Sequence, residues 1–177
     1  MTITMGGNPV ELDGPDLQVG DKAPDFTVVS DGMGDTKTLD DVIEHGRKNA
    51  LLIVVPSLDT NVCSIESQKF NARLGQLPAD TAAYVVSRDL PFAQKRWCGA
   101  QSGGAVRLGM LSDARDHRFG PAYGVLIKGV GLLARTVFII GKDKTIKYKQ
   151  VVPEVGSEPD YDDVIAAASK LSSAVNA

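Results

Sequence analysis

One stretch of the sequence limits the possible fold more than any other, the uninterrupted apolar run NALLIVVP at residues 49–56. The run is too short for a typical helix, and because it is apolar at successive positions it has no polar face to present to water. Such runs are typical of strands that are covered on both faces, as in sheets that carry helices on both sides. We therefore expect a central, fully buried strand here.

Further strand patterns follow the same logic. Residues 27–30 (TVVS), 81–89 (TAAYVVSRD) and 135–140 (RTVFII) are rich in β-branched residues, and residues 145–152 (TIKYKQVV) alternate as a hairpin partner after the turn GKDK. At the N-terminus, TITM and VELD flank a Gly-Gly-Asn turn and predict a small β-hairpin.

Helix patterns lie between these strands. Residues 38–46 (TLDDVIEHG) predict a short helix with Thr38 as N-cap and Gly46 as its stop. From residue 63, apolar positions recur at helical spacing to residue 77, and residues 90–101 and 160–175 also read as helices. Strands that alternate with helices and end in a hairpin predict an α/β fold with helices around a mixed sheet.

Length and charge restrict the class of protein. A chain of 177 residues fits a single domain spanning 1–177. The formal net charge of −3 provides no basic field for nucleic acid or acidic lipid. The first twenty residues lack lysine, arginine and an apolar core, and the longest aliphatic run is the ALLIVV of the buried strand. We therefore expect a cytoplasmic protein with no nucleic-acid partner and no membrane span.

In the reducing cytoplasm the two cysteines, Cys63 and Cys98, are expected to be thiols, which suggests redox chemistry or metal binding. Cys63 follows the strand and begins a helix, where free N–H groups and the helix dipole favour a thiolate. Thr60 stands at the N-cap to N3 spacing, so its hydroxyl would cap the turn or lie beside the sulfur, and Pro56 ends the strand. Spacing alone leaves open whether Cys63 is a nucleophile or a small buried apolar residue.

The segment PSLDTNVC, residues 56–63, resembles the P-x-x-x-T-x-x-C signature of peroxiredoxins. The segments GNPVEL, DLPFAQKRWCGAQ and AYGVLIKGVGLLARTVFII resemble the thiol peroxidase branch, the atypical two-cysteine type, and the similarity covers almost the whole chain. The resemblance implies a thioredoxin-like α/β fold, with a central mixed sheet, flanking helices and an N-terminal β-hairpin. It also implies a homodimeric, cofactor-free antioxidant enzyme that reduces hydrogen peroxide and alkyl or lipid hydroperoxides with thioredoxin as reductant. The apolar residues 122–133 would serve the dimer interface or the core.

The same resemblance implies residue roles. Cys63 is the peroxidatic cysteine, whose thiolate attacks a peroxide oxygen and becomes a sulfenic acid, and Cys98 is the resolving cysteine, which forms an intrachain disulfide with it after both helix starts partly unwind. Thr60 would hydrogen-bond the sulfur and the incoming oxygen, Pro56 would shield the intermediate, and Arg135 would hold the thiolate charged and stabilise the breaking O–O bond. Without the resemblance, Arg135 is interpreted as the cap of an exposed strand end.

Other functions receive less support. GVGLLA, residues 129–134, matches a dinucleotide fingerprint but runs directly into a strand pattern instead of a helix, so no cofactor is expected. His45 and His117 have no second ligand nearby in the sequence, so no metal is expected either. A thioredoxin-like disulfide reductase would need C-x-x-C, which is absent. A redox-sensing or structural domain with a static Cys63–Cys98 disulfide remains the alternative function.

Overall fold

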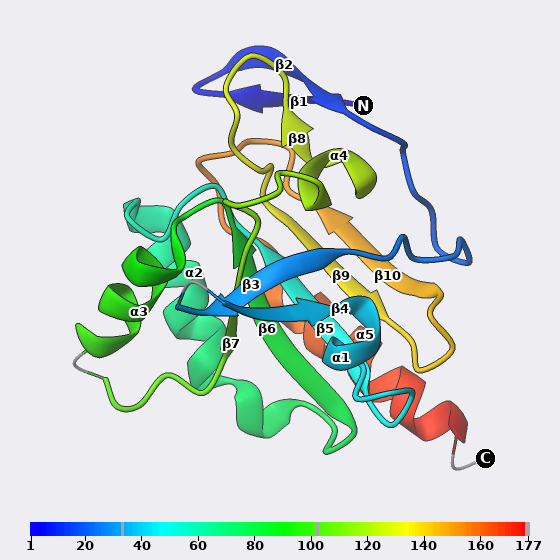
Figure 1. Ribbon diagram of the computed structural model, residues 1–177. Coiled ribbons are helices and arrows are strands. Elements are labelled where there is room, and N and C mark those ends of the chain that lie inside the picture. Colours follow the sequence, from blue (N-terminus) through cyan, green and yellow to red (C-terminus); the bar gives the residue numbers. More distant parts are fainter. Residues whose placement is uncertain (33, 102, 176–177) are drawn as a thin grey trace.

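The computed structural model describes residues 1–32, 34–101 and 103–175. Within them, seven strands form one mixed sheet and three form a smaller one (Figure 1). Across the larger sheet the strands are β10 (Ile146–Val151), β9 (Thr136–Ile140), β5 (Asn49–Val54), β6 (Thr81–Ser87), β7 (Gly109–Ser112), β3 (Thr27–Asp31) and β4 (Asp35–Thr38). The smaller sheet consists of β1 (Thr2–Met5), β2 (Asn8–Asp13) and β8 (Leu126–Ile127). The helices are α1 (Leu39–Val42), α2 (Asn61–Ala72), α3 (Pro91–Gly99), α4 (Phe119–Ala122) and α5 (Tyr161–Val175), with a 3-10 turn at Leu74–Gln76.

The central strand β5 is the one that the apolar run predicts. All of its residues are buried, and it pairs with β6 in parallel and with β9 antiparallel. Successive side chains of a strand point to opposite faces. Accordingly, Leu52 and Val54 join one apolar cluster, whereas Leu51 and Ile53 join the other. The prediction of a strand covered on both faces is confirmed.

The two apolar clusters assign the helices to opposite faces of the sheet. Phe70 of α2, Trp97 of α3 and Val164 of α5 belong to the cluster that contains Leu51. Leu39 of α1 and Phe119 of α4 belong to the cluster that contains Leu52. Helices α2, α3 and α5 therefore cover one face, and α1 and α4 lie over the other.

The hairpins agree with the sequence. Strands β1 and β2 are antiparallel and meet at Gly6 and Gly7, both with positive φ, and β9 pairs with β10 in the same way. Residues 122–133, expected to serve the dimer interface or the core, are divided: Tyr123, Ile127 and Leu133 are buried in the core, whereas Val130 is 39% exposed.

Helix α1 differs from its prediction in length. Thr38 is its N-cap and forms a capping box with Asp41, as expected. The prediction that the helix continues to Gly46 is wrong, because it ends at Val42 and the next residues leave the helical conformation: Glu44 and His45 both have positive φ. Gly46 also has positive φ and belongs to this turn.

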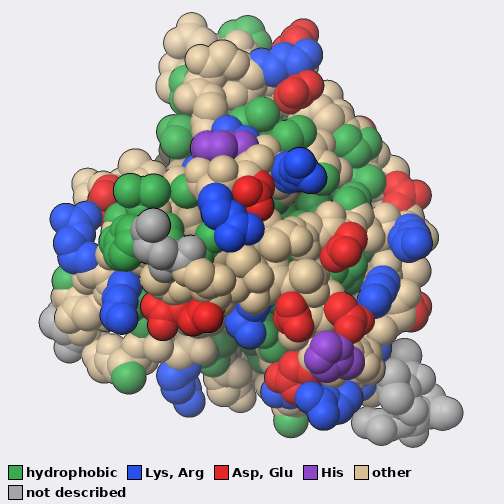
Figure 2. Space-filling model, viewed as in Figure 1, with side chains coloured by type: hydrophobic (Ala, Val, Ile, Leu, Met, Phe, Trp, Pro, Cys, Tyr) green, Lys and Arg blue, Asp and Glu red, His purple; other side chains and the backbone are tan. Residues whose placement is uncertain are grey.

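The surface carries charges of both signs. Figure 2 shows lysine and arginine side chains interspersed with aspartate and glutamate on one face of the molecule. Every helix within the described residues is too short or too polar to span a bilayer.

Candidate active site

Cys63 lies in the first turn of α2. Thr60 is the N-cap, and the first hydrogen bond of the helix joins the N–H of Ser64 to the carbonyl of Thr60 at 3.0 Å. The N–H groups of the first turn therefore have no acceptor within the helix, and their positive end favours an anion. The side chain of Cys63 is fully buried in the apolar cluster that contains Leu51.

The loop that carries Cys63 is fixed to the end of the neighbouring strand. Pro56 is buried and follows β5 after one residue. The carboxylate of Asp89, just beyond β6, accepts hydrogen bonds from Ser57 Oγ at 2.7 Å and from the N–H of Leu58 at 2.8 Å. It also accepts one from Ser87 Oγ at 2.8 Å. These bonds set the position from which α2 begins.

Thr60 occupies the predicted N-cap position, but of the two roles expected for its hydroxyl, capping the turn or lying beside the sulfur, the capping bond is not made. Its hydroxyl donates to the carbonyl of Ser57 at 2.8 Å and makes no cap hydrogen bond to the helix. Since a hydroxyl has a single hydrogen, Thr60 Oγ1 presents only acceptor lone pairs to any other partner.

Arg135 is the cation of the site. It precedes β9, is only 2% exposed, and donates from Nη2 to Sγ of Cys63 at 3.4 Å. Its Nη1 donates to Glu66, and Nε and Nη2 donate to the carbonyl of Val155 at 3.1 and 2.8 Å. The interpretation of Arg135 as the cap of an exposed strand end is therefore wrong, because the side chain is buried and all three guanidinium nitrogens donate to groups inside the protein.

The guanidinium of Arg135 thus contacts both the carboxylate of Glu66 and the sulfur of Cys63. Burial raises the pKa of Glu66 to about 7, although the charge and hydrogen bond of Arg135 act in the opposite direction. For Arg135, burial acts to lower the pKa, but Glu66 and Cys63 together outweigh it and raise the pKa. Arg135 is therefore charged, and Glu66 changes its protonation near neutral pH.

Sequence reasoning missed Glu66. It stands three residues after Cys63, and residues at this spacing share a helix face. The sequence signal for Glu66 was its place between Cys63 and the buried Ser67 and Phe70, because an acid on the core-facing side of a helix needs a buried partner.

Cys98 lies on a different helix from Cys63, as predicted. It is in the last turn of α3 and half-buried, and burial raises the pKa of its thiol. The expectation that two helix starts unwind is thus wrong for α3, where the thiol is at the helix end. The residue before Cys98 is bonded to the residue after Cys63, since Trp97 Nε1 donates to Ser64 Oγ at 2.9 Å. Both thiols are free, so the structure does not contain a static disulfide.

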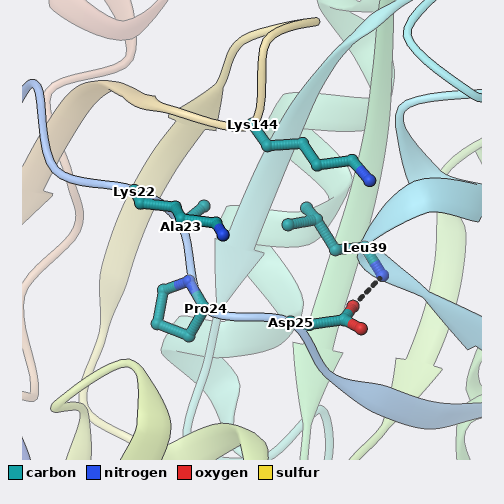
Figure 3. A pocket seen from close by; sticks show the side chains of 6 residues that line it. All are labelled: Lys22, Ala23, Pro24, Asp25, Leu39 and Lys144. Carbon is teal, nitrogen blue, oxygen red and sulfur yellow. Dashed lines mark hydrogen bonds between the residues drawn. The ribbon is translucent and has the colours of Figure 1, made fainter.

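Other candidate sites lack this chemistry. A cavity of about 420 Å³, drawn in Figure 3, is lined by Lys22, Ala23, Pro24, Asp25, Leu39 and Lys144 and by neither cysteine. Within the described ranges, no group of three or more His, Cys, Asp or Glu is suited to a metal ion. In residues 129–134, Gly129 and Gly131 have positive φ in the turn between β8 and β9.

Comparisons with known proteins agree with this geometry. The Redoxin family model matches residues 18–165. The thiol peroxidase of Streptococcus pneumoniae (strain R6) is 47% identical over 169 residues, covering 96% of this chain and 99% of its own. The thiol peroxidase of Bacillus subtilis (strain 168) is 43% identical, with coverages of 96% and 97%. The crystal structure of a peroxiredoxin-like protein from Aquifex aeolicus superposes with a TM-score of 0.85 at 41% identity, covering 96% of both chains.

A helix-borne thiol beside a buried arginine, on a thioredoxin-like sheet, defines a peroxiredoxin-type redox enzyme. The chain belongs to the Redoxin family and, within it, to the thiol peroxidases. The expected thioredoxin-like α/β fold and the expected peroxidase activity are thereby confirmed.

Proposed function

We propose that this thiol peroxidase reduces hydrogen peroxide and organic hydroperoxides through Cys63 and is regenerated by thioredoxin. The observation that carries the proposal is the contact of 3.4 Å between Cys63 Sγ and Arg135 Nη2, in the first turn of α2. A thiolate so placed has a cation and free N–H groups around it, and the thiolate is the nucleophilic form of cysteine.

In the first step the sulfur attacks the terminal oxygen of the hydroperoxide. An S–O bond forms, the O–O bond breaks, Cys63 becomes a sulfenic acid, and the leaving oxygen takes a proton and departs as water or an alcohol. Arg135 stabilises the negative charge on the leaving oxygen. Thr60, whose hydrogen is engaged with Ser57, accepts a hydrogen bond from the peroxide, and the buried Pro56 keeps water from the intermediate.

In the second step Cys98 attacks the sulfenic sulfur, releasing water and forming the Cys63–Cys98 disulfide. Disulfide formation requires Cα atoms within about 7 Å. Because the two thiols are on different helices joined by the bond from Trp97 to Ser64, we propose that the first turn of α2 and the last turn of α3 unwind to meet. The dithiol of thioredoxin then reduces the disulfide by exchange.

The whole chain is proposed to act as one domain in the cytoplasm, where reducing dithiols are maintained. We also propose a homodimer. Its support is an apolar groove lined by Val29, Pro91, Leu90 and Phe92, the last two of which are 59% and 53% exposed. Sedimentation velocity of wild type and Phe92→Arg tests it, and a wild-type monomer at micromolar concentration contradicts it.

Stopped-flow oxidation by hydrogen peroxide, together with steady-state turnover by thioredoxin and its reductase, tests the catalytic roles. Cys63→Ser is expected to abolish both reactions. Cys98→Ser is expected to keep the first oxidation at the wild-type rate and to lose thioredoxin-coupled turnover, because no disulfide forms. Steady turnover in Cys98→Ser would show that Cys98 does not resolve the intermediate.

A further inference from the structure

The carbonyl of Val155 orients the arginine of the active site. It accepts hydrogen bonds from both Nε and Nη2 of Arg135. Because a guanidinium is planar, two bonds from one edge to a single oxygen fix the plane of the group. Nη2 carries two hydrogens, so the atom that donates to Val155 also donates to Cys63. The position of this carbonyl therefore determines where Arg135 points.

Val155 is held by the N-terminal hairpin, which is far away in the sequence. The N–H of Val155 donates to the carbonyl of Thr4 at 2.9 Å, and the N–H of Thr4 donates to the carbonyl of Pro153 at 2.7 Å. Thr4 and Glu154 form a parallel bridge between the hairpin and the loop after β10. In Figure 1 the β1–β2 hairpin lies directly over this loop.

The carboxylate of Glu154 fastens the contact. Its Oε2 accepts from Thr4 Oγ1 at 2.7 Å and from the N–H of Gly7 at 3.1 Å, and its Oε1 accepts from the N–H groups of Gly6 at 3.0 Å and Gly156 at 3.2 Å. The positive φ of Gly6 and Gly7 lets two successive N–H groups face one anion. The hydroxyl of Thr4, followed by the three backbone donors, lowers the pKa of Glu154 to about 2.

We propose that Glu154 is a positioning residue for the peroxidase reaction: by holding the hairpin turn against residues 153–156 it fixes the Val155 carbonyl, which aims Arg135 at Cys63. The inference rests on the roles proposed above for Cys63 and Arg135. When the carboxylate is lost, the backbone bonds with Thr4 still hold the loop to the hairpin but the bonds to the hairpin turn are gone, so the Val155 carbonyl is less firmly placed. The guanidinium then shifts toward Glu66, and its contact with Cys63 weakens.

The test compares full-length variants by two measurements. The first is the second-order rate constant for oxidation by hydrogen peroxide. The second is the pH profile of alkylation of Cys63 by iodoacetamide in a Cys98→Ser background, which a merely structural change would not move. Glu154→Ala is expected to lower the rate constant roughly tenfold and to move the alkylation profile to higher pH. Glu154→Gln, which keeps one acceptor oxygen, is expected to fall between Glu154→Ala and wild type.

Glu11→Gln is the matched control. Glu11 is on the same hairpin, but its partner is the exposed Lys128 at 3.1 Å, so both readouts should equal wild type. If Glu154→Ala folds poorly, Thr4→Val, which removes one of the four donors, is expected to shift the profile in the same direction.

Arg135→Lys separates failure of this inference from failure of the proposed function. If Arg135→Lys lowers the oxidation rate while Glu154→Ala keeps the wild-type rate and alkylation profile, the positioning role of Glu154 is overturned and the proposed site stays intact. A slower Glu154→Ala with an unmoved alkylation profile also overturns it, because the loss is then structural. Unimpaired Arg135→Lys overturns the proposed role of the arginine itself.

Discussion

Glu66 is the buried acid of the site, and its charge state affects stability. Its side chain has no exposed surface, one oxygen is bound by Arg135, and the other, Oε1, has no partner among the described residues. An ionised carboxylate with an unsatisfied oxygen in such a place is costly. Because burial raises its pKa to about 7, the folded protein binds the proton of Glu66 more tightly than the unfolded chain does, where the ordinary value is 4.5.

This difference makes stability depend on pH. The contribution of Glu66 to the free energy of unfolding is fully present below about pH 4.5 and is lost as the pH rises through about 7, for a total of roughly 3 kcal/mol. Glu66→Gln is expected to remove this slope. Urea titrations at several values between pH 4.5 and 8 measure it, with Glu11→Gln as an exposed control. Parallel curves for wild type and Glu66→Gln would contradict the assignment.

Val155 shows where sequence reasoning about the site ends. Cys63, Pro56, Thr60 and Arg135 belong to recognisable segments, and the contact between Cys63 and Arg135 agrees with the role expected from them. Val155 contributes only a backbone carbonyl, which any residue type would supply, so the sequence contains no side-chain signal for it.

At the level of elements, α2 and α3 are joined next to both cysteines. Trp97 is 7% exposed and donates to Ser64, and Gln68 Nε2 donates to Gln101 Oε1 at 2.7 Å. Formation of the disulfide would separate these partners, so the environment of the single tryptophan would change.

Tryptophan fluorescence is therefore expected to report resolution. Adding one equivalent of hydrogen peroxide to the reduced protein should change the emission of Trp97, because its indole loses Ser64 and gains water. In Cys98→Ser the later, disulfide-linked phase of this change should be missing. Identical traces in the two proteins would contradict unwinding of α3 as part of the cycle.

Some helices and strands could be predicted from their own residues, whereas others form only because they pair with strands that are distant in the sequence. β5 was predictable because its apolar run allows few other structures, and β9 and β10 because a turn separates two strand patterns. β4 (DTKT) and β7 (GMLS) are short, and β4 is polar, so their strand conformation follows from pairing with β3 and β6. The length of α1 was overestimated because a turn at residues 44–46 intervenes.

Across the whole molecule, the proposed unwinding is confined to helix ends on one face. Hydrogen–deuterium exchange of reduced and peroxide-oxidised protein tests this. Peptides covering residues 61–65 and 95–101 are expected to exchange faster after oxidation. Peptides covering β5 are expected to stay protected in both states, since β6 and β9 pair with both of its edges. Faster exchange in β5 after oxidation would mean that the sheet itself opens.

The burial of β5 has a further consequence for the proposed cycle, in which helix ends unwind. Its sequence, NALLIV, is apolar, uncharged and free of proline, the composition of segments that form intermolecular β-structure when exposed. Because β5 is paired on both edges, unwinding that stays within the ends of α2 and α3 would leave it inaccessible to other molecules. Turnover under oxidative stress is thus compatible with a protein that does not aggregate.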